Sequence, residues 1–190
     1  MRSDGTPASN ASIGLVPANE PMEPAGSSFL APSSMTDRRG RFAIDAILPG
    51  RYLLAVNARS GPHPSAPYLS TYLVAPGGKP RVIEVGEGKR RAGFTLVVEP
   101  LAETRVAGRV VFADGRPAAE ANVVAFPIEH RSSVAGSAKT NSTGDFELRV
   151  FDGLRYVVKA GTSTSAGYRK TESLISVDGP QDGVRLLIQP

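Results

Sequence analysis

The sequence predicts an all-β chain made of two seven-stranded Greek-key sandwiches in tandem. An internal repeat is the first observation, because DGTPASNASIGLVP at Asp4–Pro17 reappears as DGRPAAEANVVAFP at Asp114–Pro127. Short runs with apolar residues at every other position are the second, and the lack of a sustained helical period is the third. Short antiparallel strands with one apolar face must bury those faces against each other, which gives a sandwich or a barrel.

The repeat is long enough to be a whole domain. Four residues near the centre of each half recur at one fixed spacing, namely Gly40, Phe42, Arg51 and Tyr52 with their counterparts Gly144, Phe146, Arg155 and Tyr156. Solenoid repeats are much shorter than this period. Because LVVEP ending at Pro100 matches LLIQP ending at Pro190, we expect a boundary within Pro100–Thr104 and domains at 1–100 and 101–190.

Apolar residues alternate along six candidate strands in the first half. Phe42, Ile44 and Ala46, for example, lie on one face of a strand. Each run is short and is bounded by Gly, Pro, Asn or Asp, which are turn residues. The expected strands are Ser12–Val16, Arg41–Ile47, Arg51–Asn57, Ser70–Val74, Arg81–Val85 and Ala92–Glu99.

The second half has the same pattern. Val106, Gly108 and Val110 share one face of its first strand, while Arg105 and Arg109 share the other. The expected strands are Arg105–Ala113, Ala121–Pro127, Gly144–Val150, Arg155–Gly161, Glu172–Val177 and Gly183–Gln189.

The two halves differ at their beginnings. A strand, TRVAGRVVFA, precedes the DGRP turn of the second half, whereas the first half starts almost directly at its DGTP turn. We therefore expect the first sandwich to lack its opening strand. Either the chain is a piece of a longer tandem array, or a neighbouring chain supplies the strand by pairing with a sheet edge.

Composition excludes several classes of protein. The chain has no cysteine, so disulfide frameworks, zinc–thiolate sites and thiol catalysis are excluded. Its formal net charge of +4 is modest and is a weak pointer to polyanions. No apolar run approaches the roughly 20 residues that cross a bilayer, so we expect no membrane insertion by this chain. The segment MRSDGTPASN lacks the apolar region of a signal peptide.

Turn and core positions form a recognisable motif. The pattern V-x-G-x-V-x-x-x-D-G-x-P-x-x-x-A-x-V, then T-D-x-x-G-x-F and P-G-x-Y-x-L-x-V, resembles the carboxypeptidase regulatory-like domain, a transthyretin-like or prealbumin-like β-sandwich related to immunoglobulin-like folds. The second half matches the opening of this pattern at Val106, Gly108, Val110, Asp114, Gly115, Pro117, Ala121 and Val123. The first half matches its centre at Thr36, Asp37, Gly40, Phe42, Pro49, Gly50, Tyr52, Leu54 and Val56. Asn141 replaces the Asp in the second half.

The resemblance implies a setting for the chain. Such domains flank the catalytic domains of metallocarboxypeptidases, precede outer-membrane transporters or stack in surface proteins. It therefore implies an exported bacterial protein that is extracellular, periplasmic or on the cell surface. The implied partners are other domains of a longer polypeptide or a surface protein.

The motif residues have structural explanations. In Asp-Gly-x-Pro, Gly takes a positive φ and Pro fixes the chain before the next strand. In Thr-Asp-x-x-Gly, the Asp side chain can accept hydrogen bonds from nearby backbone N–H groups. Phe42 and Tyr52 are expected in the core. A scaffold role thus accounts for every motif position.

No catalytic, metal or cofactor site is expected. Around Asp37 and Asp45, arginines stand where a calcium loop needs oxygen ligands. His63 and His130 lie in separate loops without a second ligand nearby, unlike the clustered Tyr and His of the iron site in intradiol dioxygenases. There is no G-x-S-x-G nucleophile motif. Catalysis by a pair of carboxylates stays open, since the spacing of Asp and Glu in the sequence singles out no pair.

Two groups of residues are candidate ligand contacts. Tyr68 and Tyr72 can share one face of a strand and stack on a sugar, or they can belong to the core. Lys89, Arg90 and Arg91 can contact an anionic polymer, or they can form a solvated turn. No aromatic residue lies beside them in the sequence, which disfavours nucleic acid as a partner.

The sequence thus favours a non-catalytic structural spacer or protein-interaction scaffold. A carbohydrate-binding or strand-accepting module is the alternative. An enzyme whose site has no recognisable motif is a weaker one.

Overall fold

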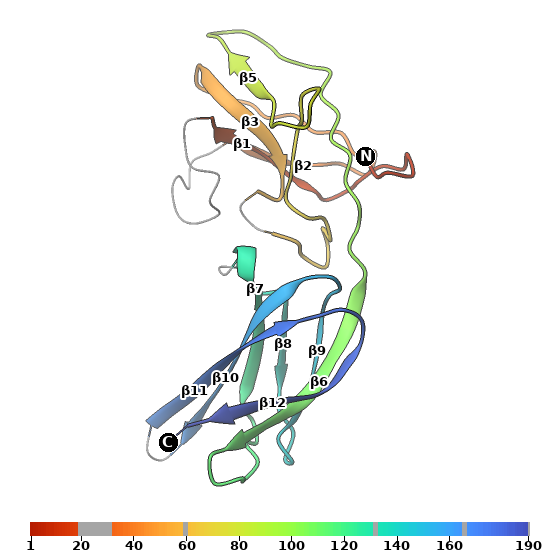
Figure 1. The fold of residues 1–190 in the computed structure, drawn as a ribbon. Coiled ribbons are helices and arrows are strands. Elements are labelled where there is room, and N and C mark those ends of the chain that lie inside the picture. The colour runs from red at the N-terminus through yellow and green to blue at the C-terminus, as the bar shows by residue number, and fades with distance from the viewer. Residues whose placement is uncertain (19–31, 59–60, 131–132, 165–166, 190) are drawn as a thin grey trace. The chain divides into compact units, whose positions relative to one another are not determined.

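The computed structural model describes residues 1–18, 32–58, 61–130, 133–164 and 167–189 (Figure 1). The chain divides into two compact units, unit 1 at Met1–Leu101 and unit 2 at Ala102–Pro190. Apart from one short 3-10 turn, η1 at Ile128–His130, the elements of the described residues are β-strands. The predicted all-β fold class is therefore confirmed. Among the described residues, no helix is long and apolar enough to cross a membrane.

Unit 2 is a sandwich of two sheets. Its strands are β6 Glu103–Phe112, β7 Asn122–Pro127, β8 Gly136–Lys139, β9 Asp145–Phe151, β10 Arg155–Thr164, β11 Gly167–Ser176 and β12 Gln181–Ile188. They form a four-stranded sheet, β11-β10-β7-β8, and a three-stranded sheet, β12-β6-β9. Only β7–β8 and β10–β11 join neighbours in one sheet, so the other connections cross between the layers. The last strand, β12, pairs with the first, β6, in parallel.

The side chains at every second position of these strands fill the space between the two sheets. Val106 and Val110 of β6 face inward, each with no exposed surface, beside Leu148 of β9 and Ile188 of β12. Val158 of β10 meets them from the other sheet and is also fully buried. Each such side chain contributes about 1.5–3 kcal/mol when it leaves water. The core therefore draws on every strand of the three-stranded sheet.

Tyr156 fastens the start of β10 to the end of β9. Its buried hydroxyl donates to the carbonyl of Phe151 at 2.8 Å and accepts from the N–H of the same residue at 2.9 Å. Burial raises the pKa of Tyr156 to about 12. In unit 1 the matching Tyr52 is only partly buried, and its hydroxyl donates to Leu48 O at 2.9 Å.

Tyr156→Phe should destabilise unit 2 by about 1–3 kcal/mol, because two buried backbone groups lose their partner. Tyr52→Phe is the matched control and should have a smaller effect. Since the folded-state pKa of Tyr156 is raised from 10.0 to about 12, stability falls as pH rises through this interval. The Phe variant should lose less stability there. Urea unfolding, with hydrogen exchange to assign the change to unit 2, measures both effects; equal loss in the two variants would contradict the role of this hydroxyl.

Unit 1 repeats the larger sheet. Its strands are β1 Ser12–Pro17, β2 Ser33–Met35, β3 Gly50–Val56, β4 Thr71–Tyr72 and β5 Val82–Val85, in the order β2-β1-β3-β4 with β5 also paired to β3. Tyr52 lies opposite Pro17, as Tyr156 lies opposite Pro127 in unit 2. The register of this strand pair is therefore the same in both units.

A hairpin at residues 74–80 divides the partner of β3 into β4 and β5. Val74 bridges Pro80, and Ala75 N–H donates to Lys79 O at 2.8 Å. Gly77 and Gly78 both have positive φ values there, of 96° and 80°. The strand expected at Ser70–Val74 is consequently reduced to β4.

Two strands expected in unit 1 do not form, at Arg41–Ile47 and Ala92–Glu99. Their counterparts in unit 2 are β9 and β12, which both pair with the central strand β6. In unit 1, Met1 and Arg2 are the residues at positions of that central strand; Val98 N–H donates to Met1 O, and Arg2 forms a parallel bridge to Val98. Without a central partner, neither segment can make a ladder. The second sheet predicted for the first sandwich is therefore not formed within the described residues.

A buried threonine makes the same two side-chain hydrogen bonds in each unit. Thr36 Oγ1 accepts from Ala11 N–H at 2.9 Å and donates to Ala8 O at 2.7 Å. Thr140 Oγ1 accepts from Ala121 N–H at 2.8 Å and donates to Ala118 O at 2.5 Å. The sequence motif predicts a turn here but does not show that its threonine also holds the Pro-Ala segment of the preceding turn.

The residue after each threonine caps the turn. Asp37 Oδ1 accepts from Arg39 N–H at 2.8 Å and from Arg41 N–H at 2.9 Å. Asn141 Oδ1 accepts in the same way from Thr143 N–H and Asp145 N–H, at 3.0 and 2.9 Å. The replacement of Asp by Asn therefore leaves this turn intact, since both side chains offer a carbonyl-type acceptor.

Candidate functional site

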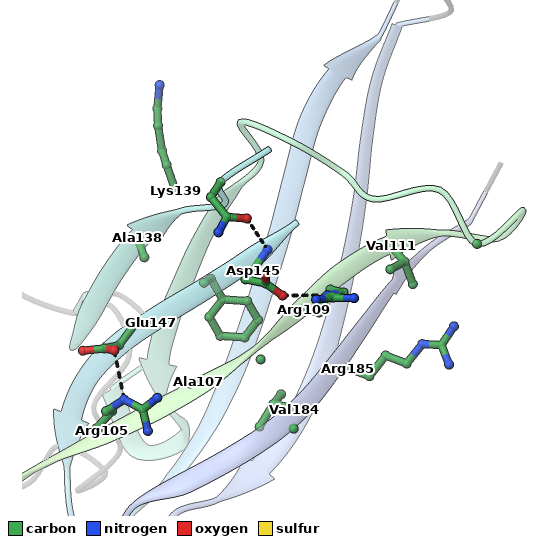
Figure 2. A pocket seen from close by; sticks show the side chains of 15 residues that line it. Arg105, Ala107, Arg109, Val111, Ala138, Lys139, Asp145, Glu147, Val184 and Arg185 are labelled. Atoms are coloured by element: carbon green, nitrogen blue, oxygen red, sulfur yellow. Dashed lines mark hydrogen bonds and ion pairs between the residues drawn. The ribbon is translucent and has the colours of Figure 1, made fainter. Parts of the chain in front are cut away.

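An open groove lies on unit 2, along the outer face of the β12-β6-β9 sheet (Figure 2). It has a volume of about 960 Å³ and extends past the edge of β9 to the end of β8. The period-two alternation of β6 builds its floor, because the side chains opposite to the core residues must point outward. Arg105, Ala107, Arg109 and Val111 are these outward residues, as the alternation in the sequence predicts.

Arg105 links all three strands of the groove. Its Nε lies 2.9 Å from Glu147 Oε2 on β9, and its Nη1 lies 2.7 Å from Asp182 Oδ1 on β12. A β-bulge between Gln181 and Val184 shifts the register of β12 at this point. Gly183 has a φ of 80° in the bulge, a conformation that favours glycine. The bulge therefore helps to bring Asp182 to Arg105.

Arg109 has a negatively charged neighbour on one side and a positively charged neighbour on the other. It lies directly across from Asp145 on β9 and from Arg185 on β12. The ion pair forms with Asp145, at 2.6 Å from Nε to Oδ1, as Figure 2 shows. Arg185 has no ion pair within the described part of the chain, and Figure 2 shows it pointing away from the other labelled charges. One arginine of the groove is thus available for a negatively charged partner.

Mutual hydrogen bonding holds these groups in their charged forms. The bond to Asp145 raises the pKa of Arg109, and the same bond, with one from Thr143, lowers the pKa of Asp145. Bonds to Glu147 and Asp182 raise the pKa of Arg105. A general acid or base needs a pKa near the working pH. The groove is therefore suited to recognising charge and is poorly suited to transferring protons.

Gly108 of β6 lines the floor of the groove. Phe146 and Val184 lie directly opposite it on the two neighbouring strands. A Cβ added here would collide with the carbonyl oxygen of Val184 and lie 2.9 Å from Phe146 Cζ. The close approach of β9 and β12 to β6 thus requires a residue without a side chain.

The structure places Tyr68 and Tyr72 in different environments. Tyr68 is 1% exposed, belongs to the core of unit 1, and its carbonyl accepts from Asn57 Nδ2 at 2.8 Å. Tyr72 lies on β4 opposite Ala55 and is partly buried, which raises its pKa. The expectation that the two rings share an accessible face is therefore corrected, because the chain between them leaves the sheet. Tyr68 has the core role that the sequence left open.

The basic run belongs to unit 1, and none of its three residues is among those that line the groove of unit 2. Lys89 closes a turn, with its N–H 3.1 Å from Gly86 O, and Arg90 beside it is exposed. Arg91 Nε donates to Glu84 O at 3.0 Å. These three side chains are solvated, and their role as ligand contacts stays a prediction.

The two histidines belong to different units, His63 to unit 1 and His130 to unit 2. His63 Nδ1 lies 2.9 Å from Ser65 Oγ in an exposed turn. The side chain of His130 lies outside the described residues. No group of three potential His, Cys, Asp or Glu ligands occurs among the residues that are described.

Comparison with known proteins gives no family assignment. No family profile and no curated protein matches the sequence. Among solved structures, a minor pilin of Streptococcus agalactiae is similar at 13% identity, over 97% of this chain and 84% of that chain, with a TM-score of 0.47. A streptococcal ancillary pilin has 15% identity over 100% of this chain and 60% of that one, with a TM-score of 0.49. The shaft pilin SpaA of Lactobacillus rhamnosus GG has 13% identity, 100% and 88% coverage, and a TM-score of 0.35. Likenesses this weak carry no inference about function.

Asp145→Asn should destabilise unit 2 at pH 7 and flatten its acid response. The folded-state pKa of Asp145 is lowered from the ordinary value of 3.8, so its contribution is complete above that value and is lost as pH falls through the lowered one. The stability difference between wild type and variant should therefore shrink in acid. Urea unfolding between pH 7 and pH 2 checks this, with the exposed Asp178→Asn as control. A difference independent of pH would contradict the ion-pair assignment.

Proposed function

We propose that this chain is a non-catalytic part of a larger exported bacterial protein, in which two carboxypeptidase regulatory-like domains act as a structural spacer and interaction scaffold. The observation that carries the proposal is the pairing of the first and last strands of unit 2. β6 and β12 run in parallel, with direct pairs from Gly108–Val184 to Phe112–Ile188.

This pairing suits a segment under tension. If the ends of unit 2 are pulled, force enters at the beginning of β6 and leaves at the end of β12. In a parallel pair these two points lie at opposite ends of the ladder, so the hydrogen bonds are sheared together and not opened one after another. A spacer between two anchored domains would be loaded in this way.

The residues that the two units share support a scaffold role. Thr36 and Thr140 make the same buried links, and Gly5 and Gly115 close the same turn with φ values of 82° and 86°. The charges of the groove are not repeated, since unit 1 has Arg41 and Ala43 at the places of Asp145 and Glu147. The repeated residues therefore maintain the fold, and recognition would be specific to one unit.

The groove supports the interaction part of the proposal. Its charges are fixed at neutral pH, and Arg185 has no ion pair among the described residues. The partner would be another domain of the same polypeptide or a protein on the bacterial surface. An extracellular, periplasmic or cell-surface location follows only from the sequence resemblance.

Single-molecule unfolding of the full chain tests the spacer role. The protein has no cysteine, so pairs of introduced cysteines give unique attachment points. Glu103→Cys with Gln189→Cys loads β6 and β12 in shear, whereas Ala113→Cys with Gln189→Cys opens the same pair from one end. All three positions are exposed.

The shear pair should unfold at clearly higher force than the matched opening pair, because several hydrogen bonds must break at once. Similar forces in both geometries would contradict a spacer role. Catalytic turnover by the purified full chain on peptide or glycan substrates would contradict the non-catalytic assignment.

A further inference from the structure

Among the described strands of unit 2, β11 is the longest one at a sheet edge. It ends the order β11-β10-β7-β8, and within the described residues it pairs with β10 alone. Its 10 residues pair with those of β10 without a bulge. The opposite edge strand of this sheet, β8, has only 4 residues, and β12 is interrupted by its bulge. A long, regular edge is a surface to which another strand adds.

Every second residue of β11 turns its backbone groups away from β10. Val177 follows β11 and donates its N–H to the carbonyl of Leu154, the residue before β10, at 2.9 Å. This bond continues the register of the two strands. Because hydrogen-bonded pairs alternate along an antiparallel ladder, the odd-numbered residues of β11 bond to β10. The even-numbered residues therefore direct their N–H and C=O groups to the open edge, namely Tyr168, Lys170, Glu172 and Leu174.

The side chains of these four residues lie on the outer face of the sheet and are exposed. Tyr168 is 66% exposed and Leu174 is 62% exposed. Glu172 lies across from Lys159 of β10, with 3.8 Å between Oε2 and Nζ. Lys170 lies across from a glycine of β10 and has no ion pair among the described residues. Along the edge, the order is therefore hydrophobic, positive, negative, hydrophobic.

This order is complementary to itself in the reverse direction. A two-fold axis at Thr171 would set two copies of β11 antiparallel. Lys170 would then lie opposite Glu172 of the second copy, and Tyr168 opposite Leu174 of the second copy. Both pairs join residues whose backbone groups point to the edge, so each pair exchanges two hydrogen bonds. Opposite charges and apolar side chains directly across from each other stabilise such a ladder.

The neighbouring registers bring like charges together. If one copy moves by two residues in one direction, Lys170 lies opposite Lys170 of the second copy. If it moves in the other direction, Glu172 lies opposite Glu172 of the second copy. Like charges directly across a ladder destabilise it. Of these three registers, the one centred on Thr171 alone pairs each charge with its opposite.

The same pairing would cover side chains that unit 2 leaves exposed. Phe126, Val157 and Leu174 lie directly across from one another on β7, β10 and β11. Tyr168 of the second copy would extend this apolar row beyond Leu174. In the neighbouring row, Glu172 would lie between Lys159 and Lys170 of the second copy. The association would therefore gain apolar burial and charge pairing as well as hydrogen bonds.

We propose that this chain associates with a second copy of itself through β11. The two four-stranded sheets then form one continuous sheet across the two-fold axis. The partner is a second copy because the edge matches its own reverse in charge, in apolar residues and in the direction of its backbone groups. This self-association goes beyond the scaffold role proposed above, and it uses neither the groove nor the pair of β6 and β12.

Sedimentation equilibrium of the full chain with charge variants tests the proposal. Wild type should show a reversible equilibrium between monomer and dimer. Lys170→Glu and Glu172→Lys each set like charges opposite one another and should raise the dimer Kd about tenfold. An equimolar mixture of the two variants should restore association, because each then meets its complement. Lys79→Glu, an exposed charge reversal in unit 1, is the control and should leave the Kd unchanged.

Amide hydrogen exchange of wild type at low and high protein concentration gives a second readout that needs no variant. The N–H groups of Tyr168, Lys170, Glu172 and Leu174 should exchange about tenfold more slowly when about nine tenths of the protein is dimeric. The odd-numbered residues between them already bond to β10 and should change less. If a charge variant fails to fold, this alternating protection decides the question.

Restored association in the mixture and alternating protection along β11 support the proposal. A wild type that stays monomeric overturns it and leaves the edge to a strand of a different polypeptide. Association that survives both charge reversals also overturns it, as does a mixture of folded variants that fails to associate. Protection that appears outside β11 and not at the four even-numbered residues has the same meaning.

Discussion

The second layer of each unit depends on hydrogen bonding to one central strand. In unit 2, β6 lies between β12 and β9 and gives both of them their ladders. The corresponding segments of unit 1 keep an alternating apolar pattern, yet neither is a strand, and the central position beside them holds Met1 and Arg2. The partner, more than the propensity of the segment, decides whether these residues form a strand. The exposure of Phe42 and Tyr52 follows from the same cause.

The larger sheet could be predicted from the sequence because its information is local. The repeated turns and the alternation around Leu54 or Val158 identify β3 and β10 without knowledge of their partners. β2 and β8 were not predicted, since Ser33–Met35 and Gly136–Lys139 are short, polar and lack alternating apolar residues. Arg41–Ile47 and Ala92–Glu99 were predicted wrongly, because the pattern records which face would be buried and contains no information on whether a neighbouring strand is present.

The candidate site could also be predicted only in part from the sequence. Alternation along β6 correctly places Arg105 and Arg109 on the outer face of the sheet. The link from Arg105 to Asp182 depends on a bulge in β12, and the groove depends on how three distant strands are aligned. Tyr68 and Tyr72 suggested a platform because they are four positions apart, but the three residues between them do not continue the strand. Spacing in the sequence predicts a shared face only within an unbroken element.

The glycine at position 108 also limits how strands can be exchanged between such domains. A strand displaced by two residues would keep its apolar face toward the core but would bring Val106 or Val110 between Phe146 and Val184, where their branched side chains collide with backbone. Only one alignment is then compatible with a closed layer. The absence of a side chain at position 108 thus selects the register of the strand. Two β-segments with the same alternation of apolar residues would therefore not be interchangeable.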